Sequence, residues 1–209
     1  MIGGGLDGGS DRMFVQIIEG QTSDGAALTR QGERWHADIR PGAVGFLGVT
    51  SGVTADGRAI TIVRFESEEA ARANSDRPEQ GAWWAETAKL YDGEISFTES
   101  SDVQEFLGGG SDDAGFVQIM KSHGVDRART GQLDEQFQKV AGARPDLIGS
   151  MRVWTGVDTC IEANYFTSEA EARAGERQEL PPELQAMMVE FQDLMRDTEF
   201  LDLTEPFLR

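Results

Sequence analysis

"RFESEEAARA", residues 64–73, is matched later in the chain by "YFTSEAEARA", residues 165–174. Each stretch begins at the aromatic end of an apolar run and continues with a serine, acidic residues, alanines and an arginine. This order is typical of a strand that leads into a helix whose N-terminus is capped by the serine. The two stretches therefore predict the same strand-to-helix junction twice in one chain.

Other landmarks recur in the same order, which indicates a tandem duplication. "FVQII" at 14–18 returns as "FVQIM" at 116–120, and "RPGAVG" at 40–45 returns as "RPDLIG" at 144–149. These matches and the junction are offset by 101 to 104 residues, whereas solenoid repeats have periods of about 20–50 residues. We predict two copies of one folding unit, with small length differences absorbed in loops.

The chain of 209 residues has 19 basic and 37 acidic residues, so its formal net charge is −18. This charge argues against nucleic acid and against an anionic membrane surface as partners. The single cysteine, Cys160, excludes an intramolecular disulfide and favours a reducing compartment. No apolar run has the length of a membrane helix, and the Gly-rich residues 1–12 do not resemble a signal peptide. We expect an acidic cytoplasmic protein with a flexible N-terminus over residues 1–12.

Hydrophobic patterning predicts the same order of elements in each copy. The first copy has a strand at 14–18, a helix ending at "RPG", two strands joined by the turn "TADGR", a helical region from Ser67 to about Tyr91, and the strand "ISFT". The second copy has strands over 116–120, 147–155, 159–166 and 199–203 and helical regions over 126–142 and 168–196. Each copy is predicted to be β-α-β-β-α-β, the ferredoxin-like order, with both helices on one face of a four-stranded antiparallel sheet.

The predicted units span residues 13–105 and 116–209 and are joined by a Gly-rich linker at 106–115. The strands at 44–49 and 60–65 are apolar on both faces, so the sheet face without helices needs a cover. The second unit is the obvious cover. We therefore predict an α+β protein in which the two antiparallel sheets pack face to face. Such a pair satisfies its own interface, so we expect a monomer.

The duplicated element order, the Pro-Gly after the first helix and the strand-to-helix junction resemble the dimeric α/β-barrel superfamily, in particular its antibiotic-biosynthesis-monooxygenase-like branch. The resemblance covers about 90 residues of each copy. It implies that a barrel which most members build from two chains is formed here within one chain, as an internal pseudo-dimer. It also implies a pocket in each unit, between sheet and helices or within the barrel. In enzymes of this branch the substrate often supplies the electrons for oxygen, and the protein contributes a dry pocket and a base.

Gln16 and Gln118 occupy the third position of "FVQI" in both copies, between large apolar residues. A buried amide needs hydrogen-bond partners or a ligand. Both are therefore candidate substrate-binding residues, and a structural bridge between the two sheets is the alternative. The haem-degrading members of the superfamily place an Asn on this strand, where this chain has Gln.

Cys160, Glu162 and Asn164 alternate along one strand, so their side chains share a face. In a partly apolar setting Glu162 is a candidate general base, and Asn164 is a candidate substrate ligand. The matched positions in the first copy, Thr61 and Val63, carry no carboxylate. This difference fits one working pocket, in the second copy, and one vestigial pocket. It also fits a strand face that contacts solvent.

The two histidines, His36 and His123, match no metal-binding spacing, so we predict no metal site and no bound cofactor. His36 is nevertheless a second candidate acid/base residue, with a helix-end or surface histidine as the alternative. Trp83 and Trp84 cannot easily both face the core from one helix, so we expect one of them to line a pocket or an interface, and both are candidate substrate-binding residues. The haem-degrading sites of the superfamily need an axial histidine after such a Trp, and none follows here.

Two classes of function remain open at this point. The first is a cofactor-independent monooxygenase or isomerase that acts on a small apolar or aromatic metabolite, with Glu162 or His36 as the acid/base residue. The second is a non-catalytic module that has the same barrel and binds a small molecule or serves a structural role. The fold cannot decide between them, because function depends on the site.

Overall fold

The computed structural model describes residues 12–140, 144–178, 182–194 and 196–209. Nearly all of the predicted flexible N-terminus, residues 1–11, lies outside the described residues. The first half contains β1 (Phe14–Gln21), α1 (Gly25–Arg34), β2 (Phe46–Val53), β3 (Arg58–Phe65), α2 (Glu68–Ser75), α3 (Pro78–Thr87) and β4 (Ser96–Ser100). The second half contains β6 (Phe116–Ser122), α4 (Arg127–Val140), β7 (Leu147–Trp154), β8 (Cys160–Phe166), α5 (Glu169–Glu176), α6 (Pro182–Leu194) and β9 (Thr198–Leu203). A π-helical turn, Trp35–Ile39, and a 3₁₀ turn, Arg40–Gly42, extend α1, and a second 3₁₀ turn, Ala88–Leu90, follows α3.

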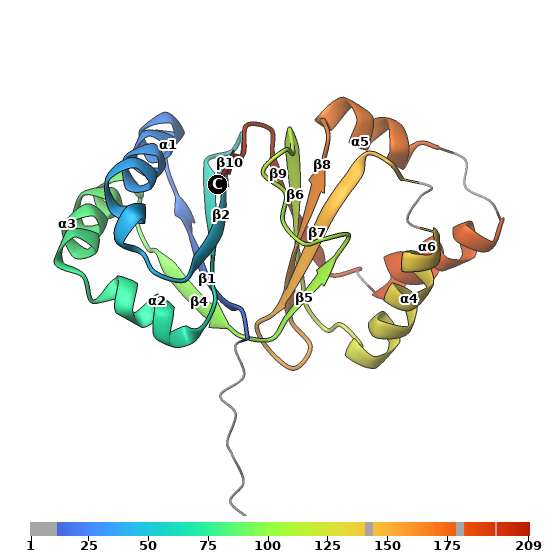
Figure 1. Cartoon of the computed structure of the whole chain (residues 1–209). Coiled ribbons are helices and arrows are strands. Elements are labelled where there is room, and N and C mark those ends of the chain that lie inside the picture. The colour runs from blue at the N-terminus through green and yellow to red at the C-terminus, as the bar shows by residue number, and fades with distance from the viewer. Residues whose placement is uncertain (1–11, 141–143, 179–181, 195) are drawn as a thin grey trace, which may run out of the picture.

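Together with β5 (Val103–Phe106) and β10 (Phe207–Leu208), these elements form two antiparallel five-stranded sheets, in the orders β10-β2-β3-β1-β4 and β5-β7-β8-β6-β9. Figure 1 shows the two sheets facing each other, with α1, α2 and α3 on the outer face of the first and α4, α5 and α6 on the outer face of the second. The prediction of two face-to-face ferredoxin-like units is confirmed. Among the described residues, no helix is long and apolar enough to cross a membrane.

The duplication extends to strand register. Phe14 pairs with Phe65 on β1 and β3, and Phe116 pairs with Phe166 on β6 and β8. Both β2 and β7 have a register shift just before a glycine, Gly48 or Gly149. A side chain at Gly149 would collide with the backbone, because its Cβ would lie 2.2 Å from the carbonyl oxygen of Gly109.

Two further strands exchange places between the halves. β5 (Val103–Phe106) follows β4 in the chain but pairs with β7, in the second sheet. β10 (Phe207–Leu208) follows β9 but pairs with β2, in the first sheet. Each half therefore supplies an edge strand to the sheet of the other. The predicted boundary of the first unit, at residue 105, falls inside β5.

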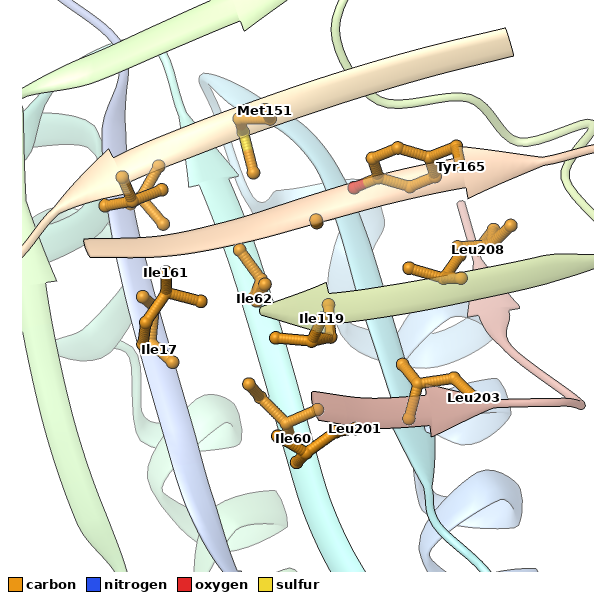
Figure 2. Close-up of a cluster of buried hydrophobic side chains, with 14 residues drawn as sticks. Ile17, Ile60, Ile62, Ile119, Met151, Ile161, Tyr165, Leu201, Leu203 and Leu208 are labelled. Carbon is orange, nitrogen blue, oxygen red and sulfur yellow. The ribbon is translucent and has the colours of Figure 1, made fainter. Parts of the chain in front are cut away.

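The core lies between the two sheets, and Figure 2 shows its larger side chains. Alternate residues of each strand point into it, including Ile17 and Ile62 from the first sheet and Ile119 and Met151 from the second. Tyr165 also faces this core, and its hydroxyl lies 2.6 Å from that of Thr50 across the interface. The other alternate set on each strand faces the helices, and the candidate site is built on that side.

Candidate functional site

A cavity of about 580 Å³ lies between the outer face of the first sheet and its helices. Small-molecule sites commonly have volumes of about 300–1,000 Å³. Three of the four tryptophans of the chain line it. The aromatic residues that line it are Trp35, Phe46, Phe65, Trp83, Trp84, Tyr91, Phe97 and Phe207. This half of the molecule therefore holds a cavity suited to an apolar, ring-containing ligand.

The aromatic rings form a continuous series from the end of α1 to β4. The ring centroid of Trp35 lies 4.9 Å from that of Phe46 and 6.4 Å from that of Trp83. Trp83 is 6.1 Å from Trp84, which is 5.4 Å from Phe97. Rings at these separations pack at tilted or edge-to-face angles and present flat apolar surfaces.

Hydrogen bonds fix two of the indoles. Trp35 donates its ring N–H to the side-chain oxygen of Gln80, at 2.6 Å. Trp83 donates its ring N–H to the backbone carbonyl of Gln31, at 2.9 Å. Because both N–H groups have partners, these indoles can lie next to an apolar ligand without an unsatisfied donor.

A small group of hydroxyls lies on the strands at the sheet side of the cavity. The hydroxyl oxygens of Ser51 on β2 and Thr61 on β3 are 2.8 Å apart. Burial raises the pKa of Tyr91, and its hydrogen bond with Thr61 opposes this shift. Tyr91 is therefore protonated at neutral pH and able to donate a hydrogen bond. Its ring packs against Gly20, where an added Cβ would lie 2.6 Å from the ring.

The charged groups of the cavity are paired with each other. Arg72 donates to both carboxylate oxygens of Glu99, at 2.8 and 2.5 Å. Gln16 donates to the same carboxylate, at 2.8 Å. The Arg72 guanidinium is the main cause of a lowered pKa for Glu99. Glu99 is therefore ionised at neutral pH and is a weak base.

The residues predicted from the sequence fall in two groups. Gln16, Trp83 and Trp84 line the cavity of the first unit. Gln118, Glu162 and Asn164 lie at helix-facing positions of the second sheet, on β6 and β8. The structure therefore does not bring the candidate residues together in one site.

His36 does not line the cavity. It lies in the π-helical turn after α1, and its Nδ1 is buried without a hydrogen-bond partner among the described residues. Burial is the main cause of its lowered pKa, and Arg40 and Arg209 add to the effect. His36 is therefore largely neutral at neutral pH.

Glu162 is held in a buried ion-pair network of the second unit. Arg152 donates through Nε to one oxygen of Glu162, at 2.6 Å, and through Nη1 to Asp134, at 2.6 Å. Asn164 donates to the other oxygen of Glu162, at 3.2 Å. Nearby, burial raises the pKa of the Cys160 thiol to about 11, so this thiol is not a nucleophile at neutral pH. Both carboxylate oxygens of Glu162 are thus engaged by protein groups.

Gln118 belongs to a trio that is repeated in both units. Its amide donates to Asp202, at 3.0 Å, and Arg173 pairs with the same carboxylate. Gln16, Glu99 and Arg72 make the corresponding contacts in the first unit. Because the trio occurs in both units, we attribute it to attaching α2 and α5 to their sheets.

Several cavity residues were not singled out as site candidates from the sequence. Ser51 and Arg72 are ordinary surface residue types in isolation, and only their positions on the helix-facing side distinguish them. Trp35 and Tyr91 gave a usable signal, because large aromatic side chains recur around the helices of the first copy and less so in the second. Counting helix-side aromatics in each copy would have indicated the first unit.

No family model matches the sequence, and no curated protein matches it. Solved structures do match. A candidate monooxygenase of Fusobacterium nucleatum superposes with a TM-score of 0.74 at 7% identity, over 95% of this chain and 94% of that one. An anthrone oxidase-like protein gives a TM-score of 0.59 at 10% identity, over 97% and 95%. A ferredoxin-fold protein of Listeria monocytogenes related to antibiotic biosynthesis monooxygenases gives 0.51 at 12% identity, over 91% and 92%.

The chain has the ferredoxin-like fold of the antibiotic-biosynthesis-monooxygenase-related proteins. The predicted resemblance is confirmed at the level of fold, and the match extends over nearly the whole length of both chains. Sequence identities of 7–12% show a shared fold, whereas a shared reaction depends on the residues of the site.

Proposed function

We propose that the first unit of this barrel binds a small, planar, uncharged aromatic molecule and oxygenates it as a cofactor-independent monooxygenase. The observation that carries the proposal is the cavity between the first sheet and its helices, lined by eight aromatic rings. Flat ligands stack favourably on such rings, and removal of their surface from water adds to the affinity.

The charge distribution of the cavity favours an uncharged ligand. Arg72 and Glu99 neutralise each other, and Arg72 also contacts Glu68, at 3.2 Å. The remaining polar lining consists of amides and hydroxyls, such as Gln16 and Thr61. A charged ligand would lose its hydration without gaining an opposite charge, which is costly.

Oxygenation is supported by the solved structures that share the fold, which include a candidate monooxygenase and an anthrone oxidase-like protein. An anthrone is a fused-ring aromatic ketone that fits the chemical class of the cavity. In such a reaction a ring methylene and dioxygen give a ring carbonyl and water, and the substrate provides the electrons. Tyr91, as a neutral donor, would stabilise the enolate oxygen of the substrate, and the aromatic walls would exclude water.

Binding without turnover is the second candidate, and the state of Glu99 favours it. Its carboxylate lines the cavity, and its pKa is lowered by Arg72. A carboxylate held in this way is a poor general base. The barrel would then sequester or sense an aromatic molecule.

Titration with anthrone separates these candidates. Quenching of tryptophan fluorescence measures binding, and oxygen uptake above the uncatalysed rate measures turnover. We expect Trp84→Ala to weaken binding at least about tenfold. Trp154→Phe, which changes the tryptophan of the second unit, should leave binding unchanged. Binding without oxygen uptake supports the second candidate, whereas no binding of anthrone or of 1-naphthol contradicts both.

A further inference from the structure

The two halves of the chain have the same fold, so their side chains can be compared position by position. The cavity of the first unit must depend on positions at which the two halves differ. At one cross-strand position the halves differ strongly. Ser51 pairs with Thr61 between β2 and β3, and Arg152 pairs with Glu162 between β7 and β8. Both pairs face the helices, and they occupy the same place in the duplicated register.

We infer that this cross-strand pair decides which unit holds a ligand, so that each chain binds one molecule, in the first unit. The inference rests on the proposed function, because it concerns the same cavity. In the first unit, the short side chains of Ser51 and Thr61 line the cavity and bond to each other at 2.8 Å. Neither side chain extends toward the helices far enough to fill the space.

In the second unit the same space is occupied by long charged side chains. The Arg152 side chain is 2% exposed and reaches Asp134 on α4, which ties β7 to the helix. Its guanidinium also lies over the ring of Phe106, on the exchanged strand β5, with the carbon 5.3 Å from the ring centroid. Glu162 completes the pair from β8.

The next helix-facing cross-strand pair differs in the same direction. Val53 and Ala59 form it in the first unit, and both line the cavity. Trp154 and Cys160 form it in the second unit, where they are buried in a cluster with Met120, Val125 and Phe191. At two successive helix-facing positions, the pair in the second unit therefore has the greater side-chain volume.

The network of the second unit is also hard to open. Moving Arg152 aside would leave Glu162 and Asp134 as buried charges without their partner, which is strongly unfavourable. A ligand there would have to displace an ion pair, whereas a ligand in the first unit displaces water from aromatic surfaces. The buried ion pairs of Arg152 thus oppose ligand binding at this position of the second unit.

Calorimetric titration of the wild-type protein with 1-naphthol tests the stoichiometry directly. We expect one molecule bound per chain. Two equivalent molecules per chain would overturn the inference and leave the proposed function standing. Absence of any binding would instead overturn the proposed function and the inference with it.

Introducing the Arg–Glu pair of the second unit into the first unit tests whether this pair prevents ligand binding. Ser51→Arg together with Thr61→Glu should weaken 1-naphthol binding at least about tenfold. The matched control, Val44→Arg together with Val157→Glu, adds two charged side chains at exposed positions outside the cavity and should stay within about threefold of wild type. If the charged variant fails to give a wild-type circular dichroism spectrum, Val53→Trp fills the cavity without new charge and should weaken binding similarly. Wild-type affinity in a folded space-filling variant would overturn the inference.

Discussion

Arg152 carries a guanidinium that is almost fully removed from solvent and is balanced by two carboxylates. A buried charge is tolerated when its partners are in place, because their attraction and hydrogen bonds offset the lost hydration. We therefore assign Glu162 a structural role, as a counter-charge of the buried Arg152 in the second unit.

Arg152→Met should lower the free energy of unfolding by about 3–5 kcal/mol, because it leaves Glu162 and Asp134 buried without a counter-charge. Urea unfolding followed by circular dichroism measures the change. Arg34→Met is the matched control, because Arg34 and Asp38 form an exposed pair with side chains 55% and 65% accessible. It should change stability by less than about 0.5 kcal/mol. Equal effects of the two substitutions would contradict the buried-pair interpretation.

The face on which Glu162 lies could be predicted from the alternation along its strand, but its partners could not. Arg152 comes from the neighbouring strand and Asp134 from a helix, and neither contact follows from local spacing. The same limit applies to Ser51 and Thr61, whose small size matters only in comparison with the register of the second unit. Site residues on one strand are thus easier to predict than the space around them.

At the scale of elements, the order β-α-β-β-α-β was predictable in both halves, whereas the exchanged strands were not. β10 pairs with β2 through only Phe207 and Leu208, and β5 has four residues. Such short strands carry too little alternation to be recognised. Their partners also lie in the other half of the chain, so no local pattern points to them.

Leu208→Ala tests the importance of the exchanged strand β10. Leu208 is 4% exposed and packs in the core between the sheets. We expect a loss of about 2–4 kcal/mol in the free energy of unfolding, from the lost burial and the cavity created. The loss should be accompanied by weaker binding of 1-naphthol, because the neighbouring Phe207 lines the ligand cavity.

Leu47→Ala is the control for this prediction, because Leu47 is 45% exposed on β2. It should cost less than about 1 kcal/mol and leave binding unchanged. Chemical denaturation of both variants, with the same fluorescence titration, compares them directly. A Leu208→Ala protein as stable as Leu47→Ala would show that β10 contributes little to the barrel.

At the scale of the whole molecule, the two units are joined by more than the linker. Tyr165 and Thr50 share a buried hydrogen bond across the interface, and Lys121 pairs with Glu19, at 2.6 Å. Arg58 and Glu199 form a further ion pair between the halves. Together with the shared apolar core and the exchanged strands, these contacts make each sheet depend on the other.

This dependence predicts a single unfolding transition. Three of the four tryptophans surround the cavity of the first unit, so fluorescence reports mainly on that half, whereas far-ultraviolet circular dichroism reports on both. In the wild type the two signals should change at the same urea concentration. Met151 belongs to the second sheet and is buried in the core between the sheets. Met151→Ala should lower the free energy of unfolding by about 2–4 kcal/mol and move the midpoints of both signals to the same lower urea concentration. If the fluorescence transition stayed at its wild-type midpoint while the circular dichroism signal split, the halves would be independent domains. In that case the stability of the first unit, and of the ligand cavity in it, would not depend on the core residues of the second sheet.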